Sequence, residues 1–106
     1  MSNAVRPPTV YVDRDEYGCF TVFPTSLVVT PAVQQLRFAN LTSESLDVEL
    51  PGALGPSTDC LRVAPNGGEA TVDVRLPGVR KSYVYRVRAG GFDGRGGSGP
   101  KVIVDP

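Results

Sequence analysis

Apolar and polar residues alternate with a period of two along most of this chain. A strand sends successive side chains to opposite faces, so this pattern is typical of β-structure, and no window of about 11 residues keeps the apolar stripe of a helix. The ten prolines and twelve glycines fall mainly between the alternating runs, where turns belong. The pattern therefore predicts seven to nine short strands, from the runs 9–13, 19–24, 26–31, 35–41, 45–51, 60–65, 69–77, 82–89 and 101–105.

The number and spacing of these runs predict an all-β fold, an antiparallel-dominated Greek-key β-sandwich. With 106 residues the chain has room for one core, so we expect a single domain, 1–106, in which residues 1–8 form a flexible N-terminal tail. The strands at 9–13 and 101–105 are expected to present free edges, through which copies could pair into a homo-oligomer. The period also predicts the inward side chains, which are Leu36, Phe38, Leu46, Val48, Leu50, Val72, Val74, Leu76, Tyr83, Tyr85 and Val87.

Charge is balanced, with eleven basic and eleven acidic side chains and a net charge of zero. This balance gives no argument for a nucleic acid or an anionic membrane surface as partner, so we expect neither. No apolar run has the length of a membrane span, and the first residues have no apolar core of signal-peptide length. We therefore expect a cytoplasmic protein, with a secreted protein trimmed of its signal peptide as the alternative.

The chain contains two cysteines, Cys19 and Cys60, and no histidine. Without histidine, neither a Ser-His-Asp nor a Cys-His device can form within the chain, so we expect no enzyme. The two cysteines could form one disulfide, but separate reduced thiols are favoured in a cytosolic protein, and two thiolates are too few for a structural zinc site. A thiol-based redox or metal-handling protein is the alternative function.

The acidic residues Asp13, Asp15 and Glu16 lie close together in the sequence. Their neighbourhood reads as a polar turn between two strands. The alternative is a weak Ca²⁺ site completed by Asp93, which would need oxygen ligands that converge. We therefore predict no metal ion and no other cofactor.

Two segments resemble the cupredoxins, the family of plastocyanin and azurin. In 20–51, a Phe-x-Pro type motif precedes a strand, and a strand of the F-x-N type follows. In 78–106, a Tyr-x-Tyr strand leads through a loop into a final V-x-V strand. In the first segment the matching residues are Phe23-Pro24, Leu27, Val29, Phe38, Asn40 and Val48. The resemblance implies a cupredoxin-like strand order.

The same resemblance fails at the copper ligands. The family's first histidine falls on Leu46, its cysteine on Val87 and its second histidine near Gly90. The axial methionine would fall in the glycine-rich loop 90–99, which contains none, and the only methionine of the chain is Met1. Because imidazole and thiolate give such a site its affinity and geometry, the resemblance implies a cupredoxin-like domain without copper.

The glycine-rich loop contains the pattern G-x-G-x-x-G at Gly94, Gly96 and Gly99. A dinucleotide site needs a helix to begin there, but Pro100 and a strand follow, so the loop is predicted to connect two strands. The single "GRGG" around Arg95 is likewise read as a connection rather than an RNA-binding segment. Phe92 is predicted to plug one end of the sandwich, with an exposed aromatic contact as the alternative.

Arg75, Arg86 and Arg88 are predicted to project from the outer faces of strands. They would form a basic stripe if their strands adjoin, whereas the favoured interpretation is cross-strand pairing with Asp73 and Glu69.

We therefore expect a non-enzymatic, copper-free cupredoxin-like module for protein–protein interaction or a structural role, which acts through strand edges and the loops 13–18, 52–60 and 90–100. A weak polyanion-binding domain is a further alternative. The candidate partner-binding residues are Phe92, Arg95, Arg86 and Arg88.

Overall fold

The computed structural model describes residues 7–89, 92–93 and 100–106, with the backbone alone at 92–93. This part of the chain is all-β, and its only helix is a single 3₁₀ turn. The elements are β1 (Thr9–Arg14), β2 (Phe20–Phe23), β3 (Ser26–Val29), β4 (Gln35–Asn40), β5 (Leu46–Glu49), η1 (Gly52–Leu54), β6 (Cys60–Val63), β7 (Gly68–Asp73), β8 (Lys81–Val84), β9 (Arg86–Ala89), β10 (Phe92–Asp93) and β11 (Lys101–Val104). The predicted all-β class is confirmed, and each predicted run contains a strand, although the run 69–77 ends as a strand at Asp73 and the run 82–89 contains two strands.

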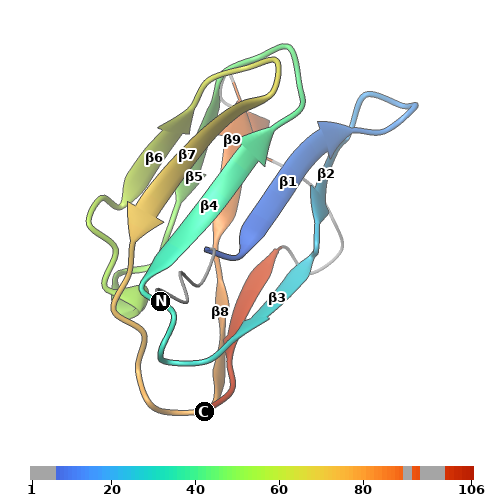
Figure 1. Ribbon diagram of the computed structural model, residues 1–106. Helices are drawn as coiled ribbons and strands as arrows, with labels where there is room; N and C mark the ends of the chain where they lie inside the picture. Colours follow the sequence, from blue (N-terminus) through green and yellow to red (C-terminus); the bar gives the residue numbers. More distant parts are fainter. Residues whose placement is uncertain (1–6, 90–91, 94–99) are drawn as a thin grey trace, which may run out of the picture.

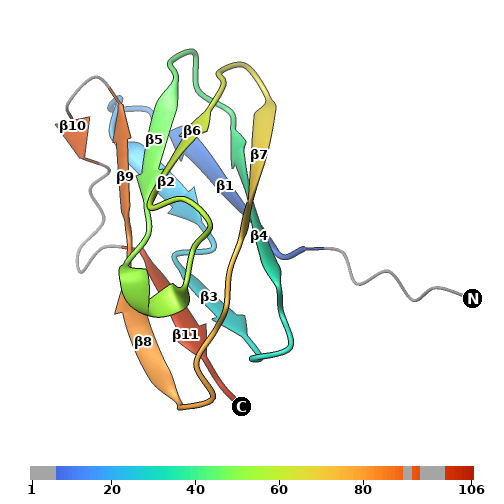
Figure 2. The ribbon, with the colours of Figure 1, turned by 90° about the vertical axis from the view of Figure 1, so that its left-hand side faces the viewer.

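The strands form three sheets, which we call sheet I (β2-β1-β4-β7), sheet II (β10-β9-β5-β6) and sheet III (β3-β11-β8). Sheets I and II lie as two layers, and sheet III continues below them (Figures 1 and 2). Six of the eight strand pairings in the described part of the chain are antiparallel. The other two, β1 with β4 and β3 with β11, are parallel, so sheets I and III are mixed.

Two segments change sheets partway along. Residues 20–29 leave sheet I at Phe23-Pro24, where the peptide bond is cis, and continue in sheet III as β3. The predicted strand 82–89 is two strands, because its pairing partner changes at Tyr85. Before Tyr85 the chain pairs with β11 in sheet III, and after it the chain pairs with β5 in sheet II. The burial alternation continues through Tyr83, Tyr85 and Val87, so the sequence pattern carries no trace of this change of partner.

The core lies between the sheets and takes apolar side chains from all three of them. Of the predicted inward residues, ten are buried, and Tyr83 is half-buried and packs against the others. Burial of this set removes apolar surface from water, which is the main source of stability in a fold of this kind. The fully buried members with the largest volumes are Tyr85, Phe38, Leu36, Leu46 and Leu54.

The predicted free edges are wrong. β1 lies between β2 and β4, and β11 lies between β3 and β8, so both strands are interior. Each takes a parallel partner that is distant in the sequence, and position near a chain end does not reveal such pairing. Of the predicted tail, residues 1–6 lie outside the described residues, whereas the carbonyl of Pro8 accepts a hydrogen bond from the Arg37 N–H (2.9 Å). No helix in the described ranges has the length and apolar character needed to cross a membrane.

Candidate functional site

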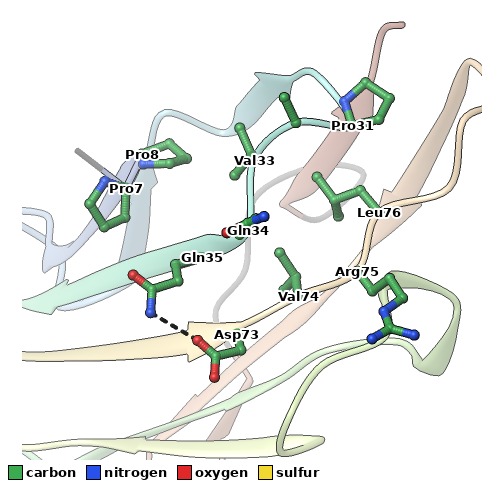
Figure 3. Close-up of a pocket in the computed structure, with 11 residues that line it drawn as sticks. Pro7, Pro8, Pro31, Val33, Gln34, Gln35, Asp73, Val74, Arg75 and Leu76 are labelled. Carbon is green, nitrogen blue, oxygen red and sulfur yellow. Dashed lines mark hydrogen bonds between the residues drawn. The ribbon is translucent and has the colours of Figure 1, made fainter. Parts of the chain in front are cut away.

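A groove of about 850 Å³ lies at one end of sheet I (Figure 3). Pro7 and Pro8 form one wall, and Pro31, Val33 and Leu76 lie across from them. Gln35 and Asp73 lie at the polar end of the groove. The remaining residues that line it are Ala32, Gln34, Val74 and Arg75. Its volume falls in the range of ligand-binding pockets.

Strand pairing brings three distant segments together to make this groove. The parallel β1–β4 pairing places the prolines beside the start of β4, and the antiparallel β4–β7 pairing places Gln35 opposite Asp73. The Gln35 amide donates to the Asp73 carboxylate (2.9 Å), which is the dashed line in Figure 3. Beyond the end of β7, the Val74 N–H still donates to the carbonyl of Gln34 (2.9 Å). The floor of the groove is therefore fixed by backbone pairing.

A smaller hollow of about 410 Å³ shares Asp73, Val74 and Arg75 with the groove. The segment 55–57 lines its other side. Ser57 donates its N–H to the carbonyl of Asp73 (2.8 Å) and accepts from the Asp73 N–H through Oγ (3.1 Å). The Arg75 N–H donates to the carbonyl of Leu54 (2.9 Å). The segment 73–75 is thus held from both sides and forms a rigid ridge between the two hollows.

Gly55 permits the close approach of this ridge. Its φ is +59°, a left-handed conformation that favours glycine. A Cβ at this position would lie 2.9 Å from Cβ of Arg75 and 3.0 Å from its carbonyl oxygen. A side chain here would push the ridge away from η1 and change the shape of the groove.

The lining of the groove combines apolar and polar groups. It offers proline and aliphatic surface, two amide side chains, one carboxylate and one guanidinium. Arg75 is exposed and has no ion-pair or hydrogen-bond partner for its guanidinium among the described residues. Such a surface can hold an extended peptide, because amide groups bond to a backbone and apolar walls receive side chains.

The basic stripe, which was the alternative arrangement of Arg75, Arg86 and Arg88, does not form. β9 pairs with β5 in sheet II, whereas Arg75 follows β7, which belongs to sheet I. On the outer face of sheet II, Arg88 contacts Glu49 (3.1 Å) and Arg62 contacts Asp47 (3.2 Å). Arg88 therefore makes the cross-strand pair that was the favoured interpretation. Its acidic partner is Glu49, whereas Asp73 and Glu69 were expected. Those two lie on sheet I, where Glu69 is 3.9 Å from Arg37 and Asp73 bonds Gln35.

Two of the candidate partner-binding residues, Arg86 and Arg88, lie on β9 and are exposed and half-buried, respectively. Both take part in further interactions within the protein. The backbone of Phe92 pairs with Ala89 in the two-residue strand β10. The plug or contact predicted for its side chain lies outside the described residues, as do Arg95 and the pattern at Gly94, Gly96 and Gly99.

The acidic turn at 13–18 is a hydrogen-bonded hairpin end. The Asp15 carboxylate accepts from the backbone N–H groups of Tyr17 and Cys19 (both 2.9 Å), and Gly18 has a φ of +78°. Arg14 bonds the carbonyl of Gly18 and forms an ion pair with Glu44. In the ranges that the structure describes, no three acidic, cysteine or histidine side chains converge as metal ligands. The Asp15 carboxylate thus has a structural role in closing the turn.

Both thiols are free and exposed. Cys19 precedes β2 at the edge of sheet I, and Cys60 begins β6 at the edge of sheet II. The structure therefore contains separate thiols, as the favoured prediction had it, and no disulfide.

The positions that the resemblance assigns to copper ligands contain core side chains. Leu46 and Val87 are 0% and 1% exposed and belong to the apolar cluster. They lie on the neighbouring strands β5 and β9, where Val87 faces Val48. Aliphatic side chains supply no lone pair to a metal ion, so these residues do not fit a copper site. Gly90 and the loop beyond it lie outside the described residues.

Asn40, from the F-x-N strand, organises the opposite end of the molecule from the groove. It is 0% exposed, and its Nδ2 donates to the carbonyls of Glu44 (2.6 Å) and Val63 (3.2 Å). Its Oδ1 accepts from the N–H and Oγ1 of Thr42 (2.9 and 2.7 Å). This amide fastens the β4–β5 connection to β6.

Sequence reasoning missed the groove, because its residues carry no motif and come together only through strand pairing. Its one local signal is the proline pair at 7–8, which was assigned to a tail. Comparison with models of known protein families and with curated proteins gives no match for this chain.

Proposed function

We propose that the chain is a non-enzymatic, copper-free cupredoxin-like module that recognises a protein partner. The observation that carries the copper-free part is the burial of Leu46 and Val87 in the core. A metal site at these positions would require two polar ligands in the place of two tightly packed aliphatic side chains, and their burial without a metal ion is unfavourable.

Three features support the cupredoxin-like strand order. The Phe23-Pro24 motif lies at the bend where one strand passes between two sheets. The strand that contains Phe38 and Asn40 runs parallel to β1. The Tyr-x-Tyr segment pairs with the final strand, through Tyr83 opposite Val102.

The recognition surface in this proposal is the groove beside Gln35 and Asp73. Its apolar walls and its amide, carboxylate and guanidinium groups suit an extended segment of a partner protein. The rigid ridge 73–75 favours binding because little conformational entropy is lost when a preformed surface receives its ligand. Arg75 gives the surface a cation that an acidic residue of the partner can meet.

Titration with Cu(II) tests the copper-free part of the proposal. We expect no intense blue absorption, and the appearance of such a band in the purified protein would contradict it. A double variant, Cys19→Ser with Cys60→Ser, is the matched control. A band that this variant abolishes would support the thiol-based alternative instead.

Selection of peptides from a random display library on the immobilised protein tests the groove. We expect selected peptides to lose at least tenfold in affinity for a Gln35→Ala, Arg75→Glu variant, since both positions are exposed and line the groove. Thr71→Ala, exposed on β7 outside the groove, should bind like the original protein. Equal affinity for all three proteins would exclude the groove as the recognition surface.

A further inference from the structure

Edge strands differ in whether their outward peptide groups already have partners. The edge strands are β2 and β7 in sheet I, β10 and β6 in sheet II, and β3 and β8 in sheet III. Side-chain hydroxyls occupy backbone groups at or beside three of these strands. The hydrogen bonds are Thr25 Oγ1 to the carbonyl of Val22 (3.2 Å), Thr58 Oγ1 to the carbonyl of Cys60 (3.0 Å) and the N–H of Asp73 to Ser57 Oγ (3.1 Å). One outward residue of each of β2, β6 and β7 is thereby occupied, which shortens the length of edge that the strand can offer to another strand.

Among the described residues, no strand pairs with the outer edge of β3. The carbonyls of Thr25 and Val29 accept hydrogen bonds from Lys101 and Asp105, next to β11. Because alternate residues of a strand direct their peptide groups to opposite sides, those of Ser26 and Val28 point away from β11. Neither residue has another hydrogen-bond partner in the part of the chain that the structure describes. Val28 is 61% exposed, so this edge also presents an apolar side chain.

Charge distinguishes β3 from β8, the other edge of sheet III. No residue between Glu16 and Arg37 is charged, so two copies of β3 can approach without repulsion. The outward peptide groups of β8 belong to Ser82 and Val84, because Tyr85 bonds the carbonyl of Pro100. A two-fold pairing of β8 with Ser82 opposite Val84 would place Arg80 opposite Arg86 of the second copy. Like charges directly opposite each other are destabilising.

We propose that this chain self-associates as a two-fold dimer through antiparallel pairing of the β3 edges. Ser26 of each copy lies opposite Val28 of the other, and the two residues exchange both of their peptide hydrogen bonds. The two copies of sheet III then form one continuous sheet of six strands. Pro24 and Pro31 flank the strand and limit the pairing to its four residues, because proline has no N–H for a ladder. The interface is therefore small and the dimer is weak.

Sedimentation of the full chain from about 10 μM to about 1 mM tests the association, since small interfaces require high concentration. We expect the mean mass to rise towards that of a dimer. Val28→Lys should raise the dissociation constant at least tenfold, because it places two positive charges on the same face of the new sheet, diagonally across the two-fold axis. Val84→Lys is the matched control, on a valine of β8 that is also more than half exposed, and should leave the association unchanged. A monomer throughout the range, or a loss of association in the control alone, would overturn the proposal.

Disulfide trapping tests the register. In a background of Cys19→Ser and Cys60→Ser, the variants Ser26→Cys and Val28→Cys are mixed and oxidised. Directly opposed residues of a hydrogen-bonded pair have Cα atoms about 5.5 Å apart, which a disulfide can span. We expect a covalent dimer in the mixture and little in either variant alone. Equal cross-linking in a mixture of Ser82→Cys with Val84→Cys would assign the contact to β8 and refute the proposal.

Discussion

Phe38 and Tyr85 meet edge to face in the core, with ring centroids 5.7 Å apart and ring planes at 71°. Phe38 comes from β4 in sheet I, and Tyr85 lies at the bend between β8 and β9, so the contact joins all three sheets. Tyr85 is 1% exposed, and its hydroxyl has no hydrogen-bond partner among the described residues. Burial raises the pKa of this phenol well above its ordinary value, because the phenolate would lose its hydration.

Tyr85 should make the protein sensitive to alkali. Its pKa is higher in the folded state than in the unfolded state, so the folded state keeps the proton longer. The stability due to this difference is complete below about pH 10 and is lost as pH rises beyond it, by up to about 1.4 kcal/mol per pH unit. Tyr85→Phe should remove this loss while it keeps the ring contact. Denaturant unfolding of both proteins at pH 8 and pH 11 measures the effect, and the same loss in both would contradict the prediction.

Asn40 should be among the least replaceable polar residues. Asn40→Leu leaves the N–H of Thr42 and the carbonyls of Glu44 and Val63 without their side-chain partner in a buried site. We expect a loss of about 2–4 kcal/mol in the free energy of unfolding, since each unsatisfied buried group costs about 1–3 kcal/mol. Thr42→Val, which removes only the hydroxyl bonds, should lose less. Urea unfolding measures both, and a loss below about 1 kcal/mol for Asn40→Leu would show that the network is dispensable.

Substitution of Gly55 and Gly67 should separate the cost of a positive φ from the cost of a steric clash. Both have positive φ, +59° and +87°, but a Cβ on Gly67 meets nothing within 4 Å, whereas one on Gly55 meets Arg75 at 2.9 Å. Gly67→Ala should cost about 1 kcal/mol from the backbone conformation alone. Gly55→Ala should cost more and should also weaken binding at the groove. Thermal unfolding compares the two, and equal losses would mean that the ridge at 73–75 relaxes freely.

The charges of sheet II should contribute little to stability. Arg62 and Asp47 form an exposed pair at 3.2 Å, and such pairs are worth about 0.2–1 kcal/mol. A double-mutant cycle of Arg62→Gln and Asp47→Asn should return a coupling energy in this range that falls with added salt.

The same charge pairing on sheet II should make the wild-type protein bind only weakly to a heparin column. Firm retention at about 0.15 M salt would instead favour the polyanion-binding alternative.

Both thiols should react in the folded protein. Cys19 and Cys60 are exposed and unpaired, so Ellman's reagent should titrate two groups without denaturant. Cys19→Ser and Cys60→Ser should each lower the titre by one group. A titre of zero before reduction and two after it would show a disulfide in solution.

Local pattern was sufficient for the approximate positions of most strands and for the inward faces that it marked. Alternation marked the buried faces of Leu36 and Phe38, of Leu46 and Val48 and of Val87, because inward direction follows from position along a strand. The same rule could not reveal which strands would pair. The predicted edges at β1 and β11 became interior strands, and Arg88 found its acidic partner on β5 rather than on β7.

The candidate site depended on pairing more than on pattern. Pro7, Gln35 and Asp73 are separated by dozens of residues and share no motif, so only the parallel β1–β4 and antiparallel β4–β7 registers bring them to one groove. The sequence by itself determined the all-β class, the inward faces and the lack of histidine ligands, which are properties of residue type and period. The tertiary structure alone decided the edges, the groove and the charge partners, because hydrogen-bonded register is a long-range choice that no short stretch encodes.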